Sequence, residues 1–404
     1  DGSRSGELTV KDGDSVKYSA VKSMYGGAYN ITPSKLNSSG RVNIPFSARD
    51  GFSFVHTLGI AMYVNLPESA VKSGIEVGLV KNDRSERYSF ADGKPITLIS
   101  YDGSESQAAQ SLPEALADFD GFVFIPYTSL VGKDGGTVEP AVINSTEWSL
   151  EVGYAAASEK CIADNYYFDE IGFYCDKDEY IKLAKQHFTG ENYIFNIGDA
   201  SGVTVTDGSD IKSETKYRSA AYGDAVLLSP PANGTGRVRI PASGNIEHSL
   251  TRGIAVYVEI PDSVAASGLT VSLSDGTGGK YYTLGNESYC VLKNSEGVKK
   301  FVSGDIRNAL SGYNGFIFIP YGSMRDENGA KMDASQLSAS GWGIEISFSA
   351  KGEAAQAQYI FDEMGYYSDI DGYLTLAADD LGKSAIENPD GPADPVAEME
   401  KGNY

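Results

Sequence analysis

The residues best suited to chemistry are two pairs of adjacent carboxylates at matching places in the chain. Asp169 and Glu170 lie within the run 167–174, and Asp362 and Glu363 lie within a near-copy 193 residues later. Each pair interrupts a short aromatic run, which is typical of a strand with polar residues in its middle. Because neighbours on a strand point to opposite faces, we do not expect either pair to act as acid and base across one bond.

The repeated carboxylates have two interpretations, and the sequence leaves both open. One member of each pair should point inward near a strand end, where a hydrogen-bonded carboxylate would hold loops in place. Alternatively, Asp169 and Asp362 bind a hard cation together with backbone carbonyls, and calcium is the cation that prefers such oxygen ligands. The sequence therefore predicts either structural calcium or buried, hydrogen-bonded carboxylates at these two positions.

Other catalytic chemistry has little support, because the histidines and cysteines form no known motif. The histidines have no metal or triad spacing and are expected to be solvated loop residues: His56, His187 and His248. The cysteines make no even disulfide set and favour lone buried thiols: Cys161, Cys175 and Cys290. We therefore predict that the chain is not an enzyme.

Tyrosine is the more informative residue, with 26 among 404 residues. A tyrosine ring can stack under a sugar while its hydroxyl forms hydrogen bonds. Trp148 and Trp342 favour core packing, with a sugar platform as the alternative. The tyrosines outside the repeated core motifs are the candidate carbohydrate-binding residues: Tyr25, Tyr29, Tyr88, Tyr101, Tyr222, Tyr281, Tyr282 and Tyr289.

These residues are carried by a domain that occurs twice. The segment 121–127 returns as 315–321, and the segment 59–64 returns as 253–258. A period this long indicates a duplicated domain and not a solenoid repeat. We predict a first module at 1–187, a second at 188–378, and an acidic, proline-rich extended tail at 379–404.

Each module reads as short strands separated by turn residues. The alternation of residues 148–154 is typical of a half-buried antiparallel strand. The strands expected in the first module are residues 7–10, 41–44, 59–64, 75–80, 96–101, 121–125, 148–154 and 166–174, with helical turns at 68–73 and 112–117. So many short strands predict an all-β fold of two tandem, duplicated antiparallel β-sandwiches, of the jelly-roll, galactose-binding-like type.

Composition excludes several classes of partner. With 33 basic and 55 acidic residues, the net charge of −22 repels phosphate backbones, so we expect no nucleic-acid partner. An apolar content of 41% indicates a globular protein. The sequence has no run of about 20 apolar residues, so we expect no membrane span.

The order of motifs resembles the carbohydrate-binding-module-like β-sandwiches of extracellular glycan-degrading bacteria. The resemblance is carried by the segments 59–64 and 253–258, by 121–129 and 315–323, and by the two closing strands. It implies a secreted or cell-surface location and a place in a larger multidomain protein. Tandem modules with a linker look like a glycan-adherence protein, such as a starch-binding component of the amylosome of a Gram-positive gut anaerobe.

The resemblance implies non-catalytic binding of a polysaccharide, with α-glucan (starch) as the leading ligand. Another plant polysaccharide (xylan, β-glucan or mannan) and a structural spacer without a ligand stay open as alternatives. The modules differ most between 81–88 and 274–282, where the second has three glycines and two adjacent tyrosines facing opposite ways. We therefore expect the second module to be the stronger sugar binder.

Overall fold

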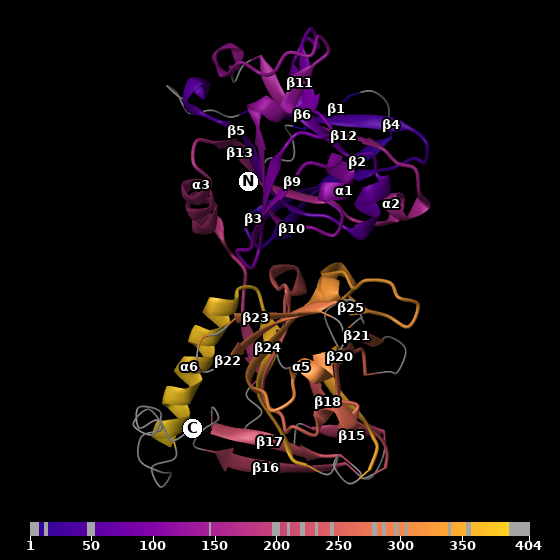
Figure 1. Ribbon diagram of the computed structural model, residues 1–404, viewed down its shortest axis with the longest axis vertical. Helices are drawn as coiled ribbons and strands as arrows, with labels where there is room; N and C mark the ends of the chain where they lie inside the picture. Colours follow the sequence, from indigo (N-terminus) through magenta and orange to yellow (C-terminus); the bar gives the residue numbers. More distant parts are fainter. Residues whose placement is uncertain are drawn as a thin grey trace. The chain divides into compact units, whose positions relative to one another are not determined.

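A computed structural model of the chain divides into two compact units, Asp1–Thr189 and Gly190–Tyr404, shown in Figure 1. The residues that the structure describes are 8–11, 15–46, 53–144, 147–195, 203–207, 211–218, 223–230, 233–242, 246–276, 281–284, 288–294, 297, 299–303, 306–337, 341–352 and 357–387. Each unit contains two antiparallel sheets, and the all-β prediction is confirmed.

The first unit stacks a six-stranded sheet on a seven-stranded sheet. The six-stranded sheet has the order β1 (Thr9–Lys11), β4 (Ser39–Pro45), β12 (Trp148–Ala155), β6 (Glu76–Lys81), β7 (Arg87–Phe90) and β11 (Leu130–Gly132). The seven-stranded sheet has the order β2 (Val16–Ser23), β3 (Gly26–Pro33), β13 (Tyr167–Tyr174), β5 (Gly59–Asn65), β10 (Asp120–Pro126), β8 (Ile96–Ser100) and β9 (Glu105–Ala108).

The second unit repeats this topology strand for strand, so the duplication extends to the fold. Its six-stranded sheet has the order β15 (Thr204–Asp207), β18 (Gly234–Pro241), β26 (Gly343–Ala350), β20 (Thr270–Ser274), β21 (Tyr281–Leu284) and β25 (Met324–Arg325). The other sheet has the order β16 (Lys212–Arg218), β17 (Gly223–Ser229), β27 (Tyr359–Tyr367), β19 (Gly253–Glu259), β24 (Asn314–Pro320), β22 (Tyr289–Asn294) and β23 (Lys299–Ser303), and β14 (Tyr193–Phe195) pairs with β27.

Most helices are single turns at the ends of strands. The α-helices are α1 (Leu112–Ala115), α2 (Glu159–Ala163), α3 (Lys177–Ala184), α4 (Val264–Ser267), α5 (Ile306–Ala309) and α6 (Ile370–Glu387). The 3₁₀ turns are η2 (Phe54–His56), η3 (Glu68–Lys72), η4 (Tyr127–Ser129), η5 (Pro140–Val142), η6 (Lys185–His187), η8 (His248–Leu250), η9 (Tyr321–Ser323) and η10 (Ala334–Gln336). Among the described residues, none of the helices has the length and apolar character needed to cross a membrane.

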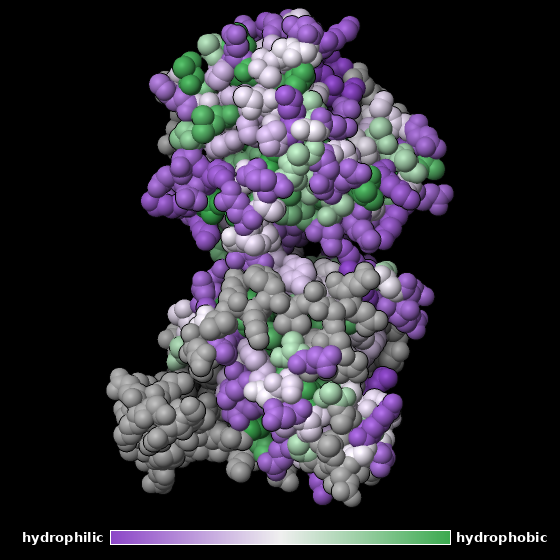
Figure 2. All heavy atoms as spheres, in the orientation of Figure 1, coloured by the Kyte–Doolittle hydropathy of each residue, from purple (hydrophilic) through white to green (hydrophobic). Residues whose placement is uncertain are grey.

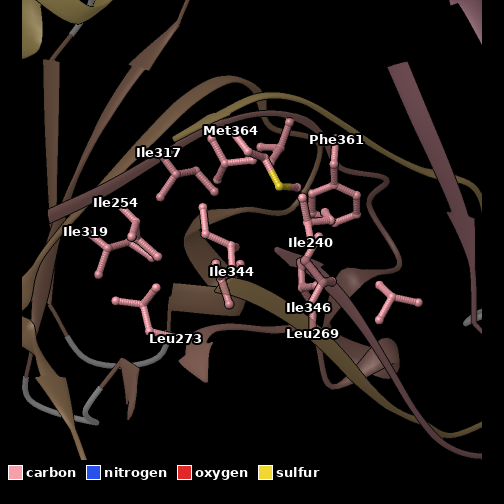
Figure 3. Packing of buried hydrophobic residues seen from close by; sticks show 14 of the residues in the cluster. Ile240, Ile254, Leu269, Leu273, Ile317, Ile319, Ile344, Ile346, Phe361 and Met364 are labelled. Atoms are coloured by element: carbon pink, nitrogen blue, oxygen red, sulfur yellow. The ribbon is translucent and has the colours of Figure 1, made fainter. Parts of the chain in front are cut away.

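Each core lies between the two sheets and is built by the alternation of their strands. In the second unit, Ile344 and Ile346 of β26 face Ile317 and Ile319 of β24 across the sandwich (Figure 3). Trp148 and Trp342 are 1% and 5% exposed, which places both in the cores, as their strands predicted. Figure 2 shows hydrophilic side chains over most of the visible surface of the first unit, with apolar residues scattered between them.

Three expectations need correction. Cys161 and Cys290 are buried, but Cys175 is exposed, because it follows the last residue of β13. His248 is 7% exposed and packs edge-on against Tyr366, so it is a core residue and not a solvated one. The tail begins as helix and not as an extended linker.

The helical start of the tail has a physical cause. Helix α6 continues to Glu387, nine residues beyond the expected module boundary. The segment 379–387 contains alanine, leucine and glutamate, which favour helix, and the first proline of the tail comes only at position 389.

Candidate functional site

Each unit has one outer sheet face covered by a helix and one outer face that is polar. In the first unit, Tyr63, Phe122 and Phe124 of the seven-stranded sheet pack against residues of α3. In the second unit, Tyr373 and Ala377 of α6 pack on the corresponding face. We call this sheet of each unit the helix-covered sheet, and the six-stranded one the polar sheet.

The paired carboxylates lie on the helix-covered sheets, at a β-bulge in the closing strand. In β13 the pairing with β5 shifts between Asp169 and Gly172, and Glu170 has a φ of 44°. Glu363 has a φ of 41° at the equivalent bulge of β27. A non-glycine residue in the left-handed region is strained and persists only where its surroundings hold it.

A tyrosine from the following helix holds each bulge. The hydroxyl of Tyr180 in α3 donates to the carbonyl of Glu170. The hydroxyl of Tyr373 in α6 donates to the carbonyl of Glu363 over 2.7 Å. This contact links each covering helix to the strand beneath it, and it explains why the carboxylate motif and the segment after it are repeated together.

The bulge corrects the expectation that the paired side chains point to opposite faces. In the first unit, Asp169 pairs with Tyr63, whose side chain packs under α3, and the Glu170 carboxylate lies 3.0 Å from Nδ1 of His187, which follows α3, so both carboxylates lie on the helix-covered side. The extra residue in the bulge interrupts the two-residue alternation of the strand, and this brings the two neighbours to one side.

Asp169 and Asp362 are 2% and 1% exposed, and both are hydrogen-bonded. Asp169 accepts from the hydroxyl of Ser23 and from the backbone N–H of Glu170. Burial raises the pKa of Asp169 to about 6, despite these hydrogen bonds. Asp362 accepts from the N–H of Glu363 over 2.9 Å.

These contacts match the interpretation of hydrogen-bonded buried carboxylates. In the described part of the chain, no three side chains of histidine, cysteine, aspartate or glutamate come together as a metal site. Calcium held by Asp169 or Asp362 together with backbone carbonyls stays a prediction for experiment.

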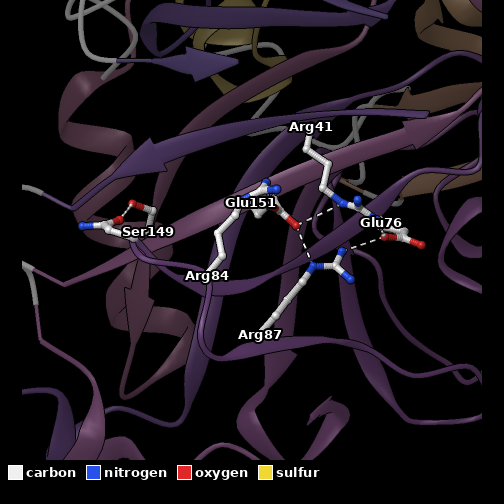
Figure 4. A network of polar contacts seen from close by, with 7 residues as sticks. Arg41, Glu76, Arg84, Arg87, Ser149 and Glu151 are labelled. Atoms are coloured by element: carbon white, nitrogen blue, oxygen red, sulfur yellow. Dashed lines mark hydrogen bonds and ion pairs between the residues drawn. The ribbon is translucent and has the colours of Figure 1, made fainter. Parts of the chain in front are cut away.

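The polar face of the first unit is a network of ion pairs around Glu151 of β12, shown in Figure 4. Glu151 is 1% exposed, and its carboxylate lies 2.6 Å from Arg87 Nε. Arg41 Nε lies 3.2 Å from it, and Arg84 Nη2 lies 3.3 Å from it. Glu76 completes the network, with its Oε2 atom 2.7 Å from Arg87 Nη2.

The arginines of this network lower the pKa of Glu76. Burial alone would raise its pKa, but the hydrogen bonds and charges of Arg87 and Arg41 outweigh burial and hold the pKa below its usual value. Burial would likewise lower the pKa of Arg87, and its two carboxylate partners raise it instead. Every guanidinium of this face thus has a carboxylate partner within the same unit.

The polar face of the second unit carries different groups at the same register positions. The backbone pairs Glu345 with Arg239 and with Ser272, as it pairs Glu151 with Asn43 and with Gly78. We call this surface the second polar face, and its outward residues are Arg237, Arg239, Thr270, Ser272, Ser274, Tyr281, Thr283 and Glu345.

Tyr281 lies within this polar surface and takes the position that Arg87 holds in the first unit. It pairs with Ser274, as Arg87 pairs with Val80. The guanidinium of Arg237 lies 5.4 Å from the centre of the Tyr281 ring, and Ser272 Oγ lies 2.9 Å from the Tyr281 hydroxyl. Arg237 Nη1 also lies 4.0 Å from the Glu345 carboxylate. The Tyr281 side chain thus lies beside the Arg237 guanidinium and the Ser272 hydroxyl, and the Arg237 guanidinium in turn lies near the Glu345 carboxylate.

Two glycines make room for a second guanidinium on this face. A Cβ atom at Gly276 would lie 2.9 Å from Arg239 Cζ, and one at Gly343 would lie 3.0 Å from Arg239 Nη2. Gly276 also has a φ of 72°, which glycine adopts most readily. Gly276, the described glycine of the segment 274–282, thus accommodates the Arg239 side chain.

The structure distributes the predicted tyrosines over several places. Tyr29 and Tyr282 are buried in the cores, and Tyr25 is buried beneath α3 on the helix-covered sheet. Tyr88 packs at a tilt against Trp148, as Tyr282 does against Trp342. Tyr101 is half-buried in a turn, and Tyr289 is 37% exposed on β22 of the helix-covered sheet. Tyr222 lies outside the described residues. Tyr281 is the predicted residue that reaches the second polar face.

Sequence reasoning missed the polar partners of Tyr281. Arg237, Arg239, Ser272 and Glu345 are not among the candidate residues that the sequence indicates. The alternation of β26, in which Glu345 lies between the buried Ile344 and Ile346, was the signal that could have identified this face.

Comparisons with known proteins add little to this geometry. No protein-family model matches the chain, and no curated protein matches it. Three of the similar solved structures are described here in turn. The first is a family 11 carbohydrate-binding module from Clostridium thermocellum in complex with a β-1,3-1,4-mixed-linked tetrasaccharide, with 10% identity, 45% of this chain and 98% of that chain covered, and a TM-score of 0.27.

The second is the N-terminal CBM22-1-CBM22-2 tandem domain of Paenibacillus barcinonensis Xyn10C, with 9% identity, 90% of this chain and 94% of that chain covered, and a TM-score of 0.24. The third is an arabinose-bound GH51 α-L-arabinofuranosidase, with 13% identity, 42% of this chain and 23% of that chain covered, and a TM-score of 0.23. Similarity this low carries no argument about what this chain binds.

Proposed function

We propose that this chain is a non-catalytic glycan-binding protein that holds an oligosaccharide on the second polar face. The observation that carries the proposal is the half-buried ring of Tyr281 among charged and hydroxyl groups. A sugar presents an apolar ring face and a rim of hydroxyls, so an aromatic ring surrounded by donors and acceptors suits both.

Two buried polar atoms of this face without a hydrogen-bond partner among the described residues support the proposal. Ser274 is 4% exposed, and neither its Oγ atom nor Arg239 Nε has a hydrogen-bond partner within the described residues. Buried polar groups nearly always have a partner, and leaving one unmade costs about 1–3 kcal/mol. Water or a ligand hydroxyl would supply that partner.

The leading ligand class is α-glucan, on the strength of the sequence resemblance alone. Xylan, β-glucan and mannan are the alternatives, because no group on the face is selective for α-linked glucose. The same resemblance supports a secreted or cell-surface location within a larger multidomain protein. These assignments are part of the proposal.

The test is a pull-down of the full chain on insoluble starch, cellulose, xylan and mannan, with Tyr281→Ala as the decisive variant. Loss of the ring should weaken binding by at least about 1 kcal/mol, as for an aromatic anchor at an interface. Circular dichroism should show an intact fold, because the ring lies outside the core. Tyr289→Ala, on the other sheet, is the matched control and should bind like the parent chain.

Three other outcomes would each indicate a different site or function. Loss of binding in Tyr289→Ala but not in Tyr281→Ala would move the site to the helix-covered sheet. Binding to none of these polysaccharides, and to neither of the acidic and reduced polymers tested below, would favour a structural spacer. Release of reducing sugar from any of them would contradict the non-catalytic assignment.

A further inference from the structure

The second polar face differs from its counterpart in how its arginines are paired. In the first unit, three guanidiniums surround Glu151, and the Arg87 guanidinium also reaches Glu76. The contacts are 2.6–3.3 Å long, so each of these guanidiniums has a carboxylate partner within the unit.

At matched positions, the second unit lacks the carboxylate of Glu76 and the guanidinium of Arg87, which Tyr281 replaces, and gains the guanidinium of Arg239. Thr270 takes the register position of Glu76, and Arg239 takes that of Asn43. The carboxylate nearest to Arg237 is Glu345, at 4.0 Å. Arg239 donates to the carbonyl of Gly341 and has no carboxylate partner among the described residues. Arg239 therefore differs from the three arginines of the first unit, each of which contacts a carboxylate.

Arg239 is also held in place. Gly276 and Gly343 leave space for its guanidinium, and the bond to the Gly341 carbonyl fixes one end of it. A planar guanidinium in a fixed position is suited to bind a carboxylate through two parallel hydrogen bonds. The ring of Tyr281 on the same face would hold the sugar that bears such a carboxylate.

From this difference, and resting on the proposed glycan site, we propose that the second polar face prefers polysaccharides containing uronic acids, which carry carboxylate groups, over the neutral α-glucan that the sequence resemblance alone favours. Arg239 binds the carboxylate, and Tyr281 contacts the sugar ring. The chain as a whole carries a charge of −22 and repels polyanions. Binding of an acidic polymer by such a protein therefore requires a local site of this kind.

The test uses one polymer in two forms: polygalacturonate, and the same polymer after reduction of its carboxyl groups to neutral galactose. Affinity electrophoresis of the full chain in gels containing each polymer should show stronger retardation by the acidic form. Raising the salt concentration should weaken that retardation, because charge attraction is screened. Arg239→Gln should lower the affinity for polygalacturonate by about tenfold, in the range expected for one charge-assisted hydrogen bond.

The matched control is Arg84→Gln, which removes a guanidinium that Glu151 already binds in the first unit. It should leave retardation by either polymer unchanged. Arg239→Gln should lower the affinity for polygalacturonate more than the affinity for the reduced polymer, because both lose a hydrogen-bond donor but only the acidic polymer loses a charge contact.

Two results would overturn the inference while leaving glycan binding in place. One is equal or stronger binding of the reduced polymer by the parent chain. The other is an Arg239→Gln variant that retains the parent affinity for polygalacturonate, or that loses affinity for both polymers equally. Failure to bind either polymer or any polysaccharide of the pull-down would instead remove the proposed function itself.

Discussion

Glu151 should be a strong determinant of stability in the first unit. Its carboxylate is 1% exposed and lies between three guanidiniums, at 2.6, 3.2 and 3.3 Å. Glu151→Gln keeps the size and shape of the side chain but removes the negative charge. The three arginines would then face one another around a neutral amide.

The magnitude follows from burial. Removing one partner of a buried ion pair costs about 3–5 kcal/mol. The three arginines are 26–36% exposed, so they can turn partly to water, which reduces the cost to about 2–3 kcal/mol. For a domain of this size, that loss lowers the melting temperature by about 5–10 °C.

Glu76→Gln is the matched control, because it removes a carboxylate from the same network at an exposed position. The Glu76 side chain is 49% exposed, so its ion pairs should contribute less than about 1 kcal/mol. Differential scanning calorimetry of the full chain and both variants measures the difference. A Glu151→Gln melting temperature within 1 °C of the parent, or an equal loss in both variants, would refute the assignment of the buried carboxylate as the centre of the network.

Further predictions concern pH, calcium and the space around Arg239. Burial raises the pKa of Asp169 from 3.8 to about 6, so the folded first unit holds this proton more tightly than the unfolded chain does. The stability of that unit should therefore fall as the pH rises from about 4 to about 6, and Asp169→Asn should remove this slope in melting curves. Burial lowers the pKa of His248 from 6.5 to about 4. The second unit should therefore lose stability as the pH falls from about 6.5 to about 4, and the His248→Gln variant should lack this dependence. Slopes of the opposite sign would contradict both assignments. If Asp169 and Asp362 bind calcium, a chelator should lower the melting temperature and added calcium should restore it; an unchanged temperature supports hydrogen-bonded carboxylates. Gly276→Ala should displace the Arg239 guanidinium and weaken polygalacturonate binding, and unaltered binding would show that the guanidinium has room to move.

The sequence predicts the fold well where core motifs repeat. The strands 59–64 and 121–125 are found as β5 and β10, and the topology of both units is the same. The hairpin of β2 and β3 was not predicted, because its residues do not alternate cleanly between apolar and polar. Its exposure pattern in β2 is correspondingly irregular.

The site could be predicted only in part, for two physical reasons. The alternation of adjacent residues places Tyr281 outward and Tyr282 in the core, and this could be read from the sequence. The bulges at Glu170 and Glu363 could not be read from the sequence. At each bulge a non-glycine residue in the left-handed region changes the direction of its neighbours, and no glycine at that position marks it. The partners of Tyr281 come from strands far apart in sequence, and only the register of the sheet brings Arg237 and Glu345 together.

The most direct test of the central claim is a crystal structure of the full chain soaked with the oligosaccharide that the pull-down identifies. We expect sugar density over the ring of Tyr281, with hydrogen bonds to the side chains of Arg239 and Glu345. Sugar bound on a helix-covered sheet or on the first unit, with the second polar face empty, would contradict it.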